Sequence, residues 1–300
     1  MLNFRLMAPQ LWCILTISAC QAQPEAASSH FTLANFDQKI LTYEPAQRPA
    51  VTDKNYRRAV FYLSETRSAT KNDPANLNAG DYWNITMAFL KLQEPQEHIA
   101  LAFQKAITDD PEAICSYIAH LGKASLDEAI PELFLPFYGR CAERTTSRED
   151  FDLTEYLAGG NFDPQLINIL YRIQKKDQRY RKGEQEMSRQ GPLDRENQAT
   201  IDSLYNIHGA YIGTSSVGPE LEYVMWAVIQ HSNRTMMERY LPVVAEAVRT
   251  GELSNNAPLK MLLDRIHWLK NGTQLFGSQV DVDLASDEEI RRIKEKYGLN

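Results

Sequence analysis

Helical periodicity, interrupted by proline and glycine, runs through almost the whole chain and restricts its fold more than any other feature. It is clearest from Tyr223 to Gln279, where apolar residues recur every three or four positions between breaks at Gly251, Pro258 and Gly272. Alternating patterns typical of strands are nearly absent. The sequence therefore predicts an all-α protein.

Bulk composition is that of an ordinary globular protein. The chain has 300 residues, 43% hydrophobic and 24% charged, which is enough for one large or two ordinary domains. Its formal net charge is -7 and it has no long basic run, so no nucleic-acid partner is predicted. No apolar run beyond the N-terminus is long enough to cross a bilayer.

The first 19 residues are typical of an export signal, with Arg5 as the only charge before a short apolar region. Ile17-Ser18-Ala19-Cys20 resembles a bacterial lipobox, in which the cysteine is acylated before cleavage; the alternative is a conventional signal peptide. This resemblance implies a lipid anchor at Cys20, and Gln21 favours the periplasmic face of the outer membrane. Residues 20–50, rich in Ala, Gln, Pro and Ser, predict a flexible tether.

Two cysteines remain beyond this segment, Cys115 and Cys141. In an oxidising periplasm they are candidates for a disulfide that brackets a helical hairpin. The alternative is a pair of buried free thiols.

Residues 51–148 predict an N-terminal subdomain of helical hairpins. Within 81–112, the large, aromatic, small and proline positions of a tetratricopeptide repeat are matched by Trp83, Leu90, Phe103, Ala106 and Pro111. This segment resembles a single such unit. It departs from the pattern at Met87 and Ile99, where small residues are usual, so a generic helical subdomain is the alternative.

Residues 149–300 predict a C-terminal multi-helix domain with an ordered series of polar motifs. These are DQRYR at 177–181, DRENQATIDSLYNIHG at 194–209, SSVG at 215–218, IQH at 229–231, RYLP at 239–242, LLDRI at 262–266 and QLFGSQ at 274–279. Over about residues 160–300 the series resembles a bacterial family of unknown function. The resemblance implies an all-helical domain, often exported or attached to other modules, and no established activity.

Several polar residues of these motifs are candidates for a site. His231 and Asp264 suit a general base and the carboxylate that orients it. Arg265 suits an anionic group of a substrate, and further ligand-binding candidates are Gln230, Gln274, Gln279, Asp177 and Arg181. The competing interpretation is a structural network in which these side chains cap helices and satisfy loop backbone.

No recognised catalytic motif or phosphate-binding glycine loop is present, and no potential ligands share a metal-binding spacing, so neither metal nor cofactor is predicted. The leading hypothesis is a lipid-anchored cell-envelope protein that binds a protein or peptide through residues 51–148. The alternative is a periplasmic hydrolase or transferase whose site comprises His231, Asp264, Arg265, Gln274 and Gln279. A purely structural envelope factor is the third hypothesis.

Overall fold

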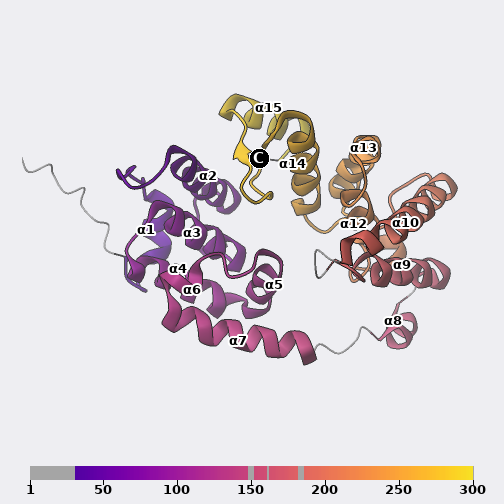
Figure 1. The fold of residues 1–300 in the computed structure, drawn as a ribbon, viewed down its shortest axis with the longest axis horizontal. Coiled ribbons are helices and arrows are strands. Elements are labelled where there is room, and N and C mark those ends of the chain that lie inside the picture. Colours follow the sequence, from indigo (N-terminus) through magenta and orange to yellow (C-terminus); the bar gives the residue numbers. More distant parts are fainter. Residues whose placement is uncertain (1–30, 148–151, 161, 182–185, 300) are drawn as a thin grey trace, which may run out of the picture.

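The computed structural model describes residues 31–147, 152–160, 162–181 and 186–299. Helices dominate these ranges, and the strands found there are β1 (Thr273–Gln274) and β2 (Asp283–Leu284), which pair in parallel. The predicted all-α class is confirmed (Figure 1). The predicted signal peptide 1–19, the acylation site Cys20, residues 20–30 and the domain boundary at 148/149 lie outside the described residues.

The N-terminal half, residues 31–147, consists of helices packed around one apolar core. They are α1 (Phe36–Thr42), α2 (Asp53–Thr70), a 3-10 turn (Pro74–Asn76), α3 (Ala79–Leu92), α4 (Gln96–Asp109), α5 (Pro111–Leu121), α6 (Leu126–Ala129) and α7 (Pro131–Ser147). A capping box starts α3, because Asn78 and Asp81 accept each other's backbone N–H. Trp83 of α3 and Phe103 of α4 are buried, so the predicted helix–turn–helix is present.

The predicted tether is wrong for residues 31–50, because this segment packs on the N-terminal half. Phe31, Phe36 and Ile40 are buried in its core. The Phe31 ring contacts Phe89 of α3, with their centroids 5.4 Å apart. Polar composition suggested a linker, but Phe36 and Ile40 lie one turn apart on α1 and are buried together, and Phe31 packs on the same core from the segment before the helix.

Cys115 and Cys141 form a disulfide between α5 and α7, with their Cα atoms 5.3 Å apart. The bond joins the last two long helices of the N-terminal half.

The C-terminal half, residues 152–299, has a second core built from eight helices of its described residues. They are α8 (Leu153–Gly159), α9 (Pro164–Asp177), α10 (Met187–His208), α11 (Thr214–Val217), α12 (Val224–Gln230), α13 (Arg234–Thr250), α14 (Ala257–Asn271) and α15 (Asp287–Tyr297). Glycine and proline usually interrupt a helix, yet α10 runs through Gly191 and Pro192. Pro192 removes only the bond to the carbonyl of Ser188, an exposed residue at the helix start, where water can replace the lost donor.

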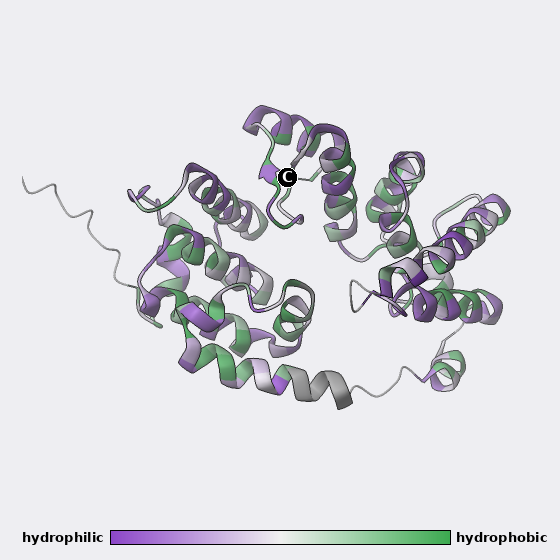
Figure 2. Cartoon of the chain, in the orientation of Figure 1, coloured by the Kyte–Doolittle hydropathy of each residue, from purple (hydrophilic) through white to green (hydrophobic). Residues whose placement is uncertain are grey.

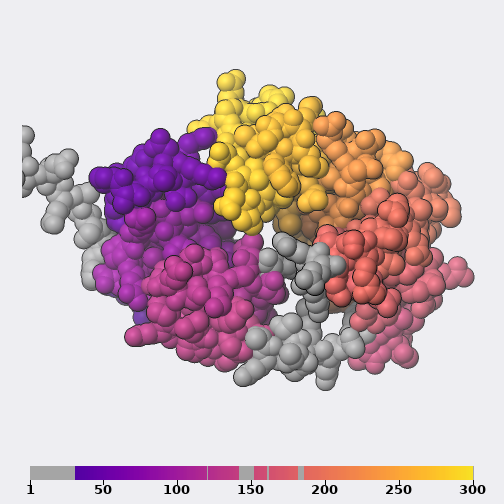
Figure 3. All heavy atoms as spheres, in the orientation of Figure 1, coloured from indigo at the N-terminus to yellow at the C-terminus, as the bar shows by residue number. Residues whose placement is uncertain are grey.

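Helix α2 belongs to both halves. Ala59 and Leu63 lie in the N-terminal core, whereas Phe61 lies in the C-terminal core. Figure 2 shows the apolar sides of the helices turned toward one another within each half. In Figure 3 the C-terminal residues lie directly against the indigo N-terminal helices. The two halves are therefore joined through α2.

Candidate functional site

Asp264 holds the backbone of the loop that carries the QLFGSQ motif. Its side chain is fully buried on α14 and accepts hydrogen bonds from the N–H groups of Leu275 (2.6 Å), Phe276 (2.6 Å) and Ser278 (2.8 Å). Burial raises the pKa of Asp264, while these donors act in the opposite direction. The carboxylate replaces the regular backbone pairing that this irregular loop lacks.

Gln274 closes the same loop from within. The fully buried side chain donates from Nε2 to the carbonyls of Gln279 (2.8 Å) and Val282 (2.6 Å), and its Oε1 accepts the N–H of Gln279 (2.6 Å). The Gln279 side chain donates to Ser278 Oγ at 3.0 Å. Every side-chain polar atom of Gln274 is thus used inside the protein, which agrees with the structural interpretation of this residue.

Arg58 of α2 inserts into the loop that Asp264 and Gln274 shape. This arginine is only 6% exposed, and its guanidinium donates to the carbonyls of Gly277 (3.0 Å) and Val282 (2.8 Å), with a longer contact to Gln279 (3.5 Å). No carboxylate lies within ion-pair distance of Arg58 among the described residues. The motif loop is therefore a socket for an arginine of the other half.

Two further contacts from α2 reinforce the junction. Lys54 pairs with Asp283 at 3.0 Å, and Glu65 accepts from Lys260 at 3.3 Å and also pairs with Lys294. Arg58, Lys54 and Glu65 of one helix thus contact the motif loop, β2, α14 and α15 of the C-terminal half.

His231 belongs to a different polar cluster, at the C-terminal ends of α9 and α12. Its Nδ1 lies 2.9 Å from Asp177 Oδ1, and Arg181 donates to both Asp177 (3.0 Å) and Asp194 (2.6 Å). Gln190 donates to Asp194 at 2.7 Å and accepts from the N–H of Tyr180 at 3.0 Å. Burial alone would raise the pKa of Asp177, but His231 and Arg181 lower it below its ordinary value.

The expected pair of His231 with Asp264 is therefore wrong. Each residue has its own partners, Asp177 for His231 and the loop amides for Asp264. Sequence spacing predicts His231 on the buried face of its helix and Asp264 at the edge of an apolar stripe, and it carries no information about which polar groups meet there.

Arg265 and Gln230 remain the least satisfied of the candidate residues. Arg265 is half-buried, its Nε has no hydrogen-bond partner, and no acceptor for its guanidinium occurs in the described part of the chain. Burial, together with the charge of Arg181, lowers its pKa. Gln230 donates to the carbonyl of Met261 at 3.5 Å, and its Oε1 is buried without a donor. These two residues keep unused binding capacity beside the His231 cluster.

Arg58, Gln190 and Glu222 are the important residues that sequence reasoning missed. Glu222, 6% exposed, accepts from the Ser254 N–H at 3.0 Å and from Thr214 Oγ1, and so fixes the SSVG segment. A usable signal existed for α2 alone, where basic residues 54, 57 and 58 lie within about one turn of each other, next to the apolar residues Ala59, Phe61 and Leu63.

In the residues that the structure describes, no three His, Cys, Asp or Glu side chains come together as a metal site. No helix of the same residues combines the length and apolarity needed to span a membrane.

The comparisons with known proteins return no relative: no protein-family model, no curated protein and no solved structure matches the chain.

Proposed function

We propose that the protein is an exported, lipid-anchored protein of the bacterial cell envelope, facing the periplasm, that acts as an interaction module. The observation that carries this proposal is the use made of the motif residues. The side-chain polar atoms of Asp264 and Gln274 are hydrogen-bonded to the backbone of the loop that receives Arg58. Side chains fully engaged in this way are typical of a scaffold that holds a surface in place.

The partner surface is assigned to the hairpin half, residues 51–148. On α5, Tyr117 and Leu121 lie one turn apart, so they share one helix face, and they are 36% and 46% exposed. In Figure 1, α5 lies on the side of the N-terminal half that faces the C-terminal half. The disulfide from Cys115 to Cys141 holds this helix against α7. A rigid helix with neighbouring exposed apolar side chains suits a protein or peptide partner.

Site-specific photo-crosslinking in intact envelopes tests the partner surface. With p-benzoylphenylalanine at position 121, we expect a discrete crosslinked product. The matched control places the same probe at Ile207, an exposed apolar residue of α10 in the other half. Identical products from both positions, or none from position 121, would contradict the proposed surface.

Membrane fractionation tests the anchor separately. The wild-type protein is expected in the outer-membrane fraction and the Cys20→Ser variant in the soluble fraction or retained as a precursor, because acyl chains supply the attachment. Equal amounts of both proteins, cleaved to the same size, in the outer-membrane fraction would refute acylation at Cys20 and leave the partner surface untouched.

The second candidate function is that of a hydrolase or transferase. Its small polar ligand site would comprise His231, Arg265 and Gln230. The unpaired Arg265 guanidinium favours it. If Arg265 binds a substrate, Arg265→Ala retains or gains thermal stability, because it removes a half-buried cation that has no partner. A marked loss of stability would instead make Arg265 part of the scaffold and remove this candidate.

A further inference from the structure

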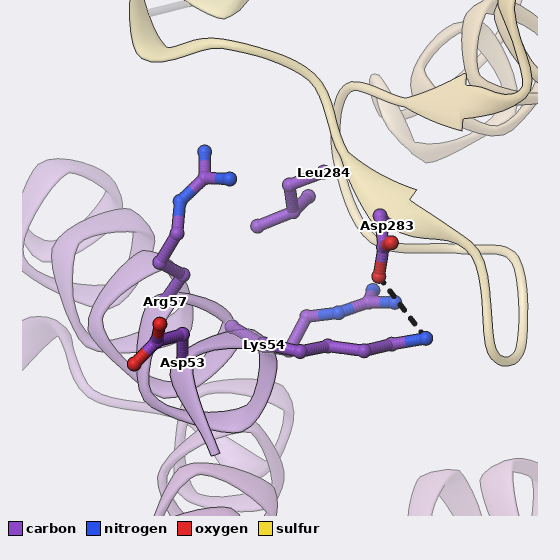
Figure 4. A pocket seen from close by; sticks show the side chains of 6 residues that line it. Asp53, Lys54, Arg57, Asp283 and Leu284 are labelled. Atoms are coloured by element: carbon purple, nitrogen blue, oxygen red, sulfur yellow. Dashed lines mark ion pairs between the residues drawn. The ribbon is translucent and has the colours of Figure 1, made fainter.

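A cavity of about 350 Å³ lies at the junction of the two halves, beside the loop that receives Arg58 and apart from the His231 cluster. It is lined by Asp53, Lys54, Arg57, Arg58, Asp283 and Leu284 (Figure 4). Four of these residues come from the start of α2, and the other two form β2. Its volume is within the range of small-molecule sites.

The arginine side chains in the cavity wall are only partly paired with carboxylates. Arg57, about half exposed, donates to the carbonyl of Ala285 at 3.0 Å, and its nearest carboxylate is the 96% exposed Asp287 at 3.4 Å. Arg58 has only neutral carbonyl acceptors from the loop. An ion pair this exposed contributes little and rearranges readily.

Lys91 of α3 adds a cation behind this wall. It is half-buried, and no carboxylate lies within ion-pair distance of its ammonium among the described residues. Burial and the charge of Arg58 lower the pKa of Lys91; Asp281 opposes this effect and Lys54 adds to it. Lys91 thus adds to the positive charge of Arg58 and Lys54 on this side of the junction.

The acidic residues of the cavity are already engaged. Asp283 pairs with Lys54, and both side chains are substantially exposed, at 63% and 47%. Asp53 accepts from Gln47 Nε2 at 2.7 Å. In Figure 4 the Lys54–Asp283 pair lies on one side of the cavity and Arg57 on the other, with Leu284 between them. The Arg57 guanidinium is thus the group best placed to bind an incoming anion.

We propose that this cavity binds a small molecule through a phosphoryl group, held by the forked guanidinium of Arg57 and by the ammonium of Lys54. Arginine binds phosphate oxygens in pairs, and lysine adds a point charge from another direction. A phosphoryl group presents three acceptor oxygens, which suits donors on opposite walls better than a carboxylate does. On binding, the Lys54 ammonium leaves Asp283 and pairs with the phosphoryl group, and Leu284 contacts the apolar part of the ligand. The inference is independent of the proposed function.

Calorimetric titration of the purified protein with inorganic phosphate, against chloride at equal ionic strength, tests the site. We expect wild type and Arg291→Ala to bind phosphate alike, because Arg291 lies on α15 in an exposed pair with Glu295. Arg57→Ala is expected to bind roughly tenfold or more weakly, since one charge-assisted pair is lost. Arg57→Lys keeps the charge and loses the forked guanidinium, so its affinity for phosphate is expected to lie between those of wild type and Arg57→Ala.

Two results would overturn the proposal. One is the absence of phosphate binding by the wild-type protein. The other is equal binding by wild type and Arg57→Ala, with thermal unfolding showing that both are folded. Two soluble probes then distinguish the sources of a phosphoryl group. Tighter binding of glycerol 3-phosphate supports a free phosphomonoester, and tighter binding of glycerophosphoglycerol supports a phospholipid headgroup.

Discussion

Replacing Asp264 with alanine tests directly whether this residue is a scaffold or a catalytic group. The change removes the acceptor of three backbone N–H groups, at 2.6, 2.6 and 2.8 Å, from a side chain that solvent does not reach. A buried donor left without an acceptor costs about 1–3 kcal/mol. The Leu275 N–H is buried and incurs the full cost, whereas Phe276 and Ser278 are partly exposed and regain water. Because the variant no longer buries a carboxylate, part of this cost is offset, and we expect a loss of roughly 2–4 kcal/mol.

Urea unfolding monitored by far-ultraviolet circular dichroism measures this loss. Asp264→Asn, which keeps one acceptor oxygen, is expected to lose less, and Glu246→Ala, which removes an exposed carboxylate on α13, to leave the midpoint unchanged. A midpoint for Asp264→Ala close to that of wild type would refute the assignment of Asp264 as the loop's anchor. It would return this carboxylate to the list of candidate catalytic groups.

Three further predictions concern other parts of the fold. Gly277→Ala should destabilise the protein more than Gly272→Ala in the same urea assay. Both glycines have positive φ, but a Cβ at 277 would lie 2.9 Å from Arg58 Nη1, whereas nothing lies within 4 Å at 272; equal effects would contradict the socket. Replacing Cys115 and Cys141 together with serine should cost roughly 3 kcal/mol, given a sequence separation of 26 residues, and dithiothreitol should then no longer affect the midpoint. Asp177→Asn should lower the free energy of unfolding at neutral pH. It should also make that free energy fall less steeply as the pH is lowered. The lowered pKa of Asp177 in the folded state means that its contribution is complete above the unfolded value, near 4, and is lost as the pH falls below it. If the free energy of unfolding falls equally steeply in acid for the wild type and the variant, this role of Asp177 is contradicted.

The helices and the importance of the polar motifs could be predicted from sequence, but the partners of the motif residues could not. Periodicity identifies which apolar residues of a helix are buried, such as Leu259, Leu262 and Ile266 of α14, but it did not predict the complete burial of Asp264 or Gln274. Their partners depend on tertiary packing. Arg58 reaches Gly277 across 219 positions of sequence, and His231 reaches Asp177 across 54. Nothing in the local pattern distinguishes Asp177 from Asp264 as the partner of a buried histidine.

The same reasoning explains the error at residues 31–50. Composition averages over a window, and the window around Phe31, Phe36 and Ile40 is dominated by small and polar residues. Two apolar side chains one helical turn apart, with one aromatic residue before the helix, are enough to attach this segment to a core. Compositional assignment of a linker is therefore weakest where isolated aromatic residues occur.

The docking of Phe31 also limits how far the protein extends from a membrane. With the proposed acyl group on Cys20, residues 21–30 are all that separate the lipid from the folded body. A fully extended chain of this length spans at most about 35–40 Å. If Cys20 is acylated as proposed, Phe31 would lie no farther than this from the bilayer surface. The buried aromatic residue would then fix the distance between the folded body and the membrane within that limit.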